Sequence, residues 1–261
     1  MKALQIAATG MAAQQMKVDV VSNNLANMST TGYNPRRADF ADLTYQQMAR
    51  PGSVSAADGS MLPTGVQIGL GVRPAAVSVV IGQGTLDATG GDLDVAIDGN
   101  GYLEVQLPSG QVGYTRDGAL KRSAEGLIVT SDGYPVVPGI TIPSDAQGLT
   151  ISASGEVWAD FADRVDPELI GQLTLSGFAN EKGLEAVGSN LFLESPASGA
   201  AFSGAPGQEG LGTLRHGYLE GSSVDAVREV TELIKAQRGY ELNAKVITAA
   251  DQMLAATTQV R

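Results

Sequence analysis

Cysteine is absent from this chain of 261 residues. Its absence excludes disulfides, thiolate metal ligands and a cysteine nucleophile. His216 is the single histidine, and no GxSxG motif accompanies it, so nothing favours a histidine-based catalytic triad. The chain also lacks a run of about 18 apolar residues, the length that a transmembrane helix needs. We therefore expect no enzyme activity, no cofactor, no metal and no insertion into a membrane.

Basic residues are few: 17 Lys and Arg stand against 28 Asp and Glu, which gives a formal net charge of −11. They are also scattered, so we expect no nucleic-acid partner. The first residues, MKALQIAATGMAA, loosely resemble a secretory signal, but Gln5, Thr9 and Gly10 interrupt the apolar stretch. We expect this segment to be structural and not to be cleaved.

The end of the chain, residues 221–261, is the strongest helical candidate. It contains no proline and is rich in residues that favour helix, and we expect Ser222 or Ser223 to cap its start. Large side chains recur there every seven residues, a spacing that keeps one stripe toward one partner. This stripe consists of Leu233, Tyr240, Ile247 and Leu254. A second apolar stripe beside it contains Val227, Ile234, Leu242, Val246, Ala249, Met253 and Val260.

The start of the chain repeats this pattern. Residues 4–27 predict a second helix, and its seven-residue stripe consists of Leu4, Met11, Val18 and Leu25. A helix with apolar side chains on two sides must contact more than one neighbour. The rest of the chain has too few helical segments to supply these neighbours, which indicates self-assembly into a homo-oligomer.

Between the two ends, residues 82–203 predict a β domain, because short apolar runs alternate there with turn sequences. Hairpin-type turns are expected at residues 98–101, 116–118 and 131–133. Residues 41–50 (ADLTYQQMAR) have a helix-like composition, and the Gly- and Pro-rich sequence after them indicates an extended segment or hairpin. The expected fold class is α+β.

Two motifs at opposite ends of the chain resemble the flagellar rod and hook proteins. Residues 23–40 (NNLANMSTTGYNPRRADF) are similar to the amino-terminal signature of that family, and residues 224–247 (VDAVREVTELIKAQRGYELNAKVI) to its carboxy-terminal signature. The family positions in the first motif are Asn23, Asn24, Leu25, Ala26, Asn27, Thr31, Gly32 and Tyr33. In the second motif, Gly239 stands where the family usually has Ala, a change that costs up to about 1 kcal/mol of helix propensity.

Residues 62–74 (LPTGVQIGLGVRP) resemble the distal rod members of the family in particular. The resemblance implies that residues 50–67 are an insertion that wedges between subunits and keeps a tube straight and stiff. The candidate residues of this rod-stiffening segment are Arg50, Pro51, Gly52, Leu62, Pro63 and Gly65.

The resemblance implies three parts of the chain. Residues 1–30 with 222–261 would form a terminal coiled-coil-like helical domain, residues 31–81 with 204–221 an extended connecting layer, and residues 82–203 a central all-β domain. The implied function is that of a structural subunit of the distal rod, a rigid helical tube that transmits motor torque across the periplasm to the hook. The implied partners are other rod proteins, the hook protein, the surrounding ring proteins and the type III export apparatus. Export to the basal body would then need no cleaved signal peptide.

Two alternatives stay open at this point. Within the family, the chain could be a hook or proximal rod protein, and residues 50–74 would distinguish these from the distal rod. Outside the family, it could be a secreted β-rich calcium-dependent adhesin or a hydrolase. The acidic residues that such a protein would use are Asp92, Asp94, Asp98, Asp160, Asp163 and Asp166.

Overall fold

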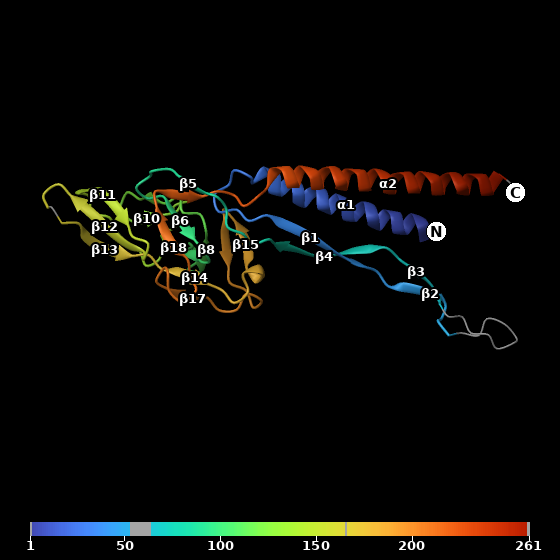
Figure 1. Ribbon diagram of the computed structural model, residues 1–261, viewed down its shortest axis with the longest axis horizontal. Coiled ribbons are helices and arrows are strands. Elements are labelled where there is room, and N and C mark those ends of the chain that lie inside the picture. The colour runs from blue at the N-terminus through green and yellow to red at the C-terminus, as the bar shows by residue number, and fades with distance from the viewer. Residues whose placement is uncertain (1, 53–63, 165, 260–261) are drawn as a thin grey trace. The chain divides into compact units, whose positions relative to one another are not determined.

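The computed structural model describes residues 2–52, 64–164 and 166–259. The chain divides into two compact units: unit 1 comprises residues 1–25, 36–78 and 226–261, and unit 2 comprises residues 26–35 and 79–225. The α+β prediction is confirmed, because a helix stands at each end of the sequence and β-strands fill the sequence between them (Figure 1). The division into three parts stays a prediction.

Unit 1 consists of two helices and a β-ribbon. The helices are α1 (Lys2–Ala26) and α2 (Ala226–Gln259). The strands of the ribbon are β1 (Arg36–Asp42), β2 (Tyr45–Ala49), β3 (Val66–Gly69) and β4 (Val72–Val79). Antiparallel pairing joins β2 to β3, and β1 pairs with β4. In the part of the chain that is described, neither helix is both long and apolar enough to cross a membrane.

The two helices lie side by side and run in opposite directions (Figure 1). At one end, Asn24 of α1 bonds to Glu229 of α2. Toward the other end, the side chain of Asn243 lies against Gly10 of α1. Residue numbers therefore rise along α1 while they fall along α2.

The β-ribbon follows α1 over most of the helix. Near the start of α1, the Lys2 ammonium donates to the Gln46 side chain of β2. In the middle, the Val72 backbone N–H donates to the Thr9 hydroxyl at 3.3 Å. Because contacts recur along the helix, α1 and the ribbon form one packed element.

Two local predictions for unit 1 are wrong. Residues 41–50 are not helical but contain β2, because propensity differences of a few tenths of a kcal/mol per residue yield to backbone pairing with β3. The predicted hairpin is confirmed by that pairing. The helix α2 begins at Ala226, so neither Ser222 nor Ser223 caps it. Ser223 instead donates its backbone N–H to the Tyr33 carbonyl at 3.0 Å.

Unit 2 is a β body whose largest sheet has the strand order β15-β16-β8-β7-β14-β17. These strands are β7 (Tyr102–Gln106), β8 (Val112–Thr115), β14 (Leu175–Gly177), β15 (Glu185–Gly188), β16 (Leu191–Leu193) and β17 (Phe202–Gly204). A second, three-stranded sheet has the order β11-β12-β13, with β11 (Ala146–Ile151), β12 (Glu156–Phe161) and β13 (Glu168–Gln172). A short 3-10 helix, η1 (Glu181–Gly183), precedes β15.

Three antiparallel pairs complete unit 2. They are β5 (Leu86–Ala88) with β19 (Tyr218–Glu220), β6 (Val95–Asp98) with β18 (Thr213–His216), and β9 (Lys121–Arg122) with β10 (Ile128–Val129). The first two pairs bring the end of the β region back beside its beginning. The main core contains fully buried Ile97, Leu103, Ile128 and Leu175, and Tyr102, Tyr114 and Phe178 form a second, aromatic cluster.

The predicted hairpin turns have different outcomes. Residues 131–133 do form a hairpin turn, since the Thr130 N–H donates to the Tyr134 carbonyl at 2.9 Å and Val129 bridges to Pro135. Residues 98–101 do not, because β6 pairs with β18 and β7 pairs with β8 and β14. Residues 116–118 follow β8, whose partners are β7 and β16, so they do not join paired strands either.

Candidate assembly surface

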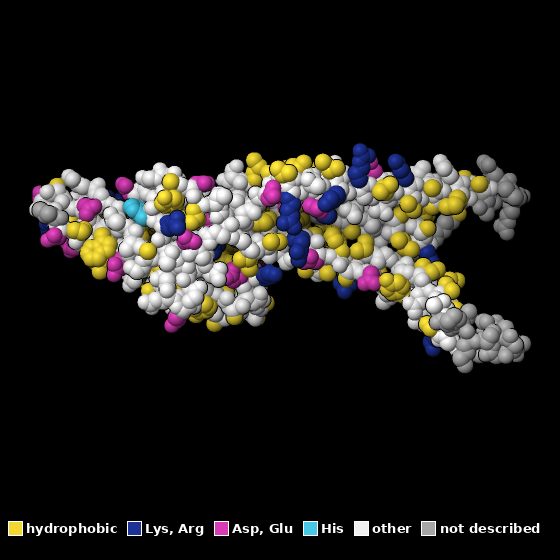
Figure 2. All heavy atoms as spheres, viewed as in Figure 1, with side chains coloured by type: hydrophobic (Ala, Val, Ile, Leu, Met, Phe, Trp, Pro, Cys, Tyr) yellow, Lys and Arg dark blue, Asp and Glu magenta, His cyan; other side chains and the backbone are white. Residues whose placement is uncertain are grey.

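The outer face of α2 exposes large apolar side chains to solvent. Leu242, Val246 and Met253 are 63%, 49% and 64% exposed, and their spacing of four and seven residues places them on one face of the helix. Val227, Val230 and Ile234 are also exposed in the first half of α2. Figure 2 shows apolar side chains along this helix. The described members of the second stripe are thus left uncovered by the folded chain, and Val260 lies outside the described residues.

The first stripe occupies a different environment. Leu233, Ile247 and Leu254 of α2 are partly buried, and Ala236 and Ala250 beside them are buried. On α1, the stripe residues Leu4, Met11, Val18 and Leu25 are all partly buried. Tyr240 is the exception in the α2 stripe, with 45% of its surface exposed.

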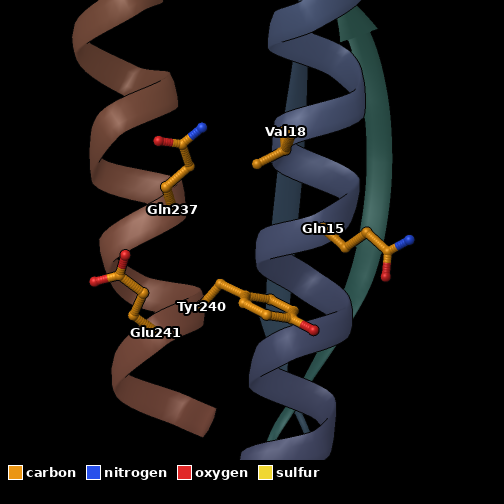
Figure 3. Close-up of a pocket in the computed structure, with 5 residues that line it drawn as sticks. All are labelled: Gln15, Val18, Gln237, Tyr240 and Glu241. Carbon is orange, nitrogen blue, oxygen red and sulfur yellow. The ribbon is translucent and has the colours of Figure 1, made fainter.

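Tyr240 lines a groove of about 450 Å³ on the helix pair. Gln15 and Val18 contribute from α1, and Gln237 and Glu241 contribute from α2. In Figure 3, Val18 and Tyr240 project from the two helices toward the space between them. The groove has an apolar floor and amide and carboxylate side chains around it, so it can receive an amphipathic side chain from another chain.

Two glycines allow the helices to approach closely. A Cβ atom at Gly10 would lie 2.9 Å from Oδ1 of Asn243, and one at Gly239 would lie 3.0 Å from Cδ of Gln14. Real Cβ contacts are longer, so a larger residue at either position requires a neighbouring side chain to move. Gly239 is therefore suited to the packing of this chain, although it costs helix propensity.

A lysine–glutamate pair joins the helices. The Lys17 ammonium lies 2.6 Å from the Glu232 carboxylate, and Lys235 lies 2.7 Å from its other oxygen. Hydrogen bonds from Lys17, which has the largest effect, and from Lys235 lower the pKa of Glu232 to about 2. Because these side chains are partly exposed, the pair contributes modestly to stability and weakens with salt.

This pair predicts a defined dependence of stability on pH. The pKa of Glu232 lies below its ordinary value of 4.5, so the pair stabilises the fold above that pH, and its contribution is lost as the pH falls toward about 2. We expect Glu232→Gln to flatten this part of the profile, measured by urea denaturation at several pH values. Glu241→Gln is the matched control, because Glu241 pairs with Arg238 on its own helix. Identical profiles for Glu232→Gln and the unchanged chain would contradict the assignment.

Asn24 is the most enclosed polar residue of α1, with 1% of its surface exposed. Its amide nitrogen donates to the Arg36 carbonyl at 2.8 Å, and its amide oxygen accepts the Arg36 N–H at 2.8 Å. The same nitrogen lies 3.1 Å from the Glu229 carboxylate. One side chain therefore joins α1, β1 and α2. Sequence reasoning singled out Asn24 as a motif residue without finding this role.

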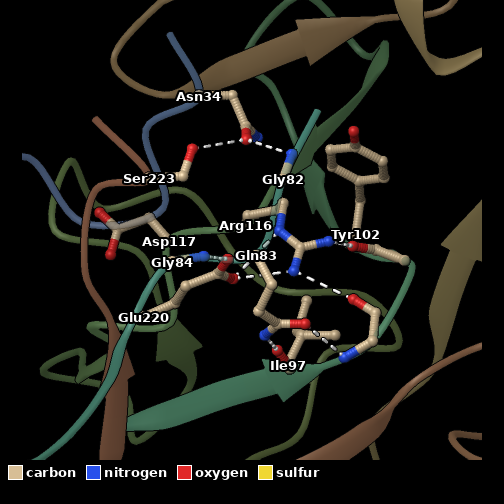
Figure 4. A network of polar contacts seen from close by, with 12 residues as sticks. Asn34, Gly82, Gln83, Gly84, Ile97, Tyr102, Arg116, Asp117, Glu220 and Ser223 are labelled. Carbon is tan, nitrogen blue, oxygen red and sulfur yellow. Dashed lines mark hydrogen bonds and ion pairs between the residues drawn. The ribbon is translucent and has the colours of Figure 1, made fainter. Parts of the chain in front are cut away.

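The other residues of the amino-terminal motif are placed differently. Asn23, Leu25 and Ala26 lie on the last turns of α1, and Asn27 follows directly after the helix. Thr31, Gly32 and Tyr33 belong to unit 2, where they bond to Asp117, Glu220 and Ser223, respectively. Figure 4 shows these three partners in a polar network with Arg116. The sequence analysis missed both Arg116 and Glu220: it placed Arg116 in a hairpin-type turn and did not single out Glu220.

The rod-stiffening segment is described in part. Arg50, Pro51 and Gly52 follow β2, and a Cβ atom at Gly65 would lie 2.5 Å from the Ala49 carbonyl oxygen and 2.6 Å from Cδ of Pro51. The two arms of the ribbon thus touch at this level. Leu62 and Pro63 lie outside the described residues.

Two of the acidic residues considered for calcium binding have other partners. Asp98 pairs with Arg215 at 3.0 Å, and Asp94 accepts a hydrogen bond from the Thr89 hydroxyl at 2.5 Å. Among the described residues, no three Asp, Glu or His side chains gather as metal ligands. His216 contacts the Asp92 carbonyl at 2.9 Å.

Charge is divided unevenly between the two units. The sequence of unit 1 carries 11 Lys and Arg against 8 Asp and Glu, whereas unit 2 carries 6 against 20. The unit with the exposed apolar helix is thus nearly neutral, and the β body is strongly acidic. Copies of the β body therefore repel one another, and salt reduces that repulsion.

Family comparisons match both ends and the middle of the chain. Residues 4–34 match the Flagella basal body rod protein family, and residues 215–260 match the Flagellar basal body rod FlgEFG protein C-terminal family. Residues 96–159 match the Flagellar hook protein FlgE/F/G D1 domain.

Full-length relatives agree with these matches. The chain is 54% identical over 261 residues to the flagellar basal-body rod protein FlgG of Caulobacter vibrioides, with 100% of both chains covered. It is 49% identical over 253 residues to the FlgG of Agrobacterium fabrum, with 97% of each chain covered. The FlgG of Borreliella burgdorferi is 43% identical over 256 residues, covering 97% of this chain and 96% of the relative. This chain therefore belongs to the family of flagellar basal-body rod proteins.

Proposed function

We propose that the chain assembles with copies of itself, through its terminal helices, into a rigid helical tube that carries torque from the motor to the hook. The chain is a structural subunit of the distal rod, as full-length identity to proteins named FlgG supports. A catalytic role forms no part of the proposal. The hook, the proximal rod and the calcium-dependent adhesin or hydrolase are less favoured interpretations.

One observation carries the proposal: α2 exposes Leu242, Val246 and Met253 on one face although its opposite face already packs on α1. Burying each such side chain contributes about 1.5–3 kcal/mol. A soluble chain that leaves several of them on one helix gains this energy only by binding another surface. Since both terminal helices lie within the segments that match the rod protein families, we assign that surface to other copies of this chain.

A tube requires contacts between unlike surfaces, because a contact between like surfaces closes into a dimer. Unit 1 offers three different surfaces: the exposed face of α2, the groove beside Tyr240, and the ribbon with exposed Tyr45 and Met48. We propose that the seven-residue stripes of α1 and α2 pack in the inner layer of the tube. We also propose that residues 50–67 wedge between neighbours and stiffen it.

Membership of the basal-body rod family places the chain in the flagellar basal body, where it assembles with other flagellar components. We propose that its neighbours are other rod proteins, the hook protein and the surrounding ring proteins. We further propose export through the type III apparatus to the periplasm without a cleaved signal peptide.

The proposal predicts concentration-dependent assembly of the purified chain. We expect sedimentation velocity to show large species as the concentration rises, with slower proteolysis of both ends. Electron microscopy of these species should show straight tubes. Salt should favour assembly, because it screens repulsion between the acidic β bodies. A chain that stays monomeric at every concentration and ionic strength would overturn the proposal.

A further inference from the structure

A buried ion pair lies within unit 2, where Arg116 meets Glu220 (Figure 4). Their side chains are 5% and 2% exposed. The guanidinium donates from Nε and Nη2 to one carboxylate oxygen of Glu220, at 3.1 and 2.9 Å. Nη1 and Nη2 also donate to the carbonyls of Gly101 and Gly99, at 3.1 and 3.0 Å. The pair therefore ties β19 to the loop between β6 and β7.

Glu220 extends the network to two other segments. Its free carboxylate oxygen accepts the Gly84 N–H at 3.0 Å. Its backbone carbonyl accepts the Gly32 N–H at 2.9 Å. Gln83 adds a further tie, because its amide donates to the Ile97 carbonyl at 2.6 Å and accepts the Gly99 N–H at 2.8 Å.

Asn34 and Ser223 close the network on its other side. The Asn34 amide oxygen accepts the Gly82 N–H and the Ser223 hydroxyl, each at 3.1 Å. The backbones also touch, since a Cβ atom at Gly84 would lie 1.9 Å from the Gly221 carbonyl oxygen. Only glycine fits at this approach.

The segments in this network are the ones that lead to unit 1. The chain passes between the units after residues 25, 35, 78 and 225. Residues 31–34, 82–84 and 220–223 of unit 2 lie within six residues of the crossings after residues 35, 78 and 225. In unit 2, hydrogen bonds fasten all three segments to one another and to the β body.

We propose that the Arg116–Glu220 ion pair is a clamp that makes these chain connections one stiff joint, so that the β body turns with its connections and does not twist against them. This inference rests on the proposed function in torque transmission. An ion pair suits the task because its hydrogen bonds fix direction and distance, whereas an apolar contact permits sliding. Arg116 and Glu220 act as positioning residues.

Amide hydrogen exchange on the full chain tests the clamp. We expect Arg116→Met/Glu220→Met, which removes both charges at similar volume, to speed exchange about tenfold at Gly32, Gly84 and Gly221. Amides of the core strands β7 and β12 should keep their rates. Arg215→Met is the matched control, because it removes an exposed ion pair of unit 2. If the double variant fails to fold, Glu220→Gln takes its place. This variant retains an oxygen acceptor, so it should change the exchange rates in the same direction by a smaller factor.

Tubes provide the mechanical readout, and the double variant should form tubes that bend more in electron micrographs. Unchanged exchange at the three glycines, or an equal change in β7 and β12, would overturn the clamp. The exchange experiment uses dilute monomer, so its result does not depend on whether the chain assembles. A chain that never assembles would refute the proposed function and leave the clamp intact, whereas straight tubes with unchanged exchange would refute the clamp alone.

Discussion

Replacing Leu242 and Val246 together with Asp is expected to raise the concentration needed for assembly about 100-fold or more. Each side chain that stays in water forfeits about 1.5–3 kcal/mol of burial, and about 1.4 kcal/mol corresponds to a tenfold change in an equilibrium constant. Burying a new carboxylate adds a further penalty. Sedimentation velocity across a concentration series measures this shift directly.

The matched control for this prediction is Thr248→Asp. Thr248 is exposed on the same helix. It is two residues from Val246, and this separation places it on a different face of the helix. Thr248→Asp adds one negative charge and the double change adds two, so its direct counterpart is the single change Val246→Asp. Val, Thr and Asp have similar helix propensities, so the folded monomer should respond similarly to these two single changes. Assembly that suffers as much from Thr248→Asp as from the double change would show that the Leu242 face is not the contact surface.

The Asn24→Ala substitution is expected to lower the free energy of unfolding of unit 1 by about 3 kcal/mol. It leaves the backbone N–H and carbonyl of Arg36 without the partners that Asn24 supplies, and it removes a donor from Glu229. A buried polar group that loses its partner costs about 1–3 kcal/mol. Urea denaturation followed at 222 nm reports this loss, because unit 1 holds both long helices.

Asn23→Ala is the control, since Asn23 is the neighbouring residue of α1 and is exposed. Surface substitutions of this kind usually change stability by less than about 0.5 kcal/mol. Both variants lose an amide at nearly the same place in the helix, so propensity cancels in the comparison. Equal losses for the two variants would mean that Asn24 does not join the helices to the ribbon.

The predictions from sequence succeeded where the signal is local. The apolar periodicity of residues 4–27 and 221–261 predicted both helices, because side chains three and four residues apart share a helix face whatever surrounds them. The turn at residues 131–133 likewise depends on neighbouring residues alone. The prediction for residues 41–50 failed because their composition favours neither helix nor strand strongly, and pairing with β3 decided the outcome.

The polar contacts that join the elements were not predicted, because the residues in each contact are far apart in the sequence. Arg116 and Glu220 are 104 positions apart, and Asn24 and Glu229 are 205 apart. In the sequence, Arg116-Asp117-Gly118 is typical of a hairpin turn. Residues 82–203 contain five basic residues, Arg116, Lys121, Arg122, Arg164 and Lys182, and no local pattern distinguishes Arg116 from the others.

By itself, the sequence determined that two long helices carry more apolar surface than the chain could cover, since periodicity and composition follow from neighbouring residues. Only the tertiary structure decided which stripe is covered and which is exposed: on α2, Leu233 is partly buried and Ala236 is buried, whereas Leu242 and Val246 remain in solvent. The tertiary structure also decided which polar residues join the elements. The physical reason is that a helix face gains its partner only when distant segments meet, and that meeting depends on the packing of the whole chain.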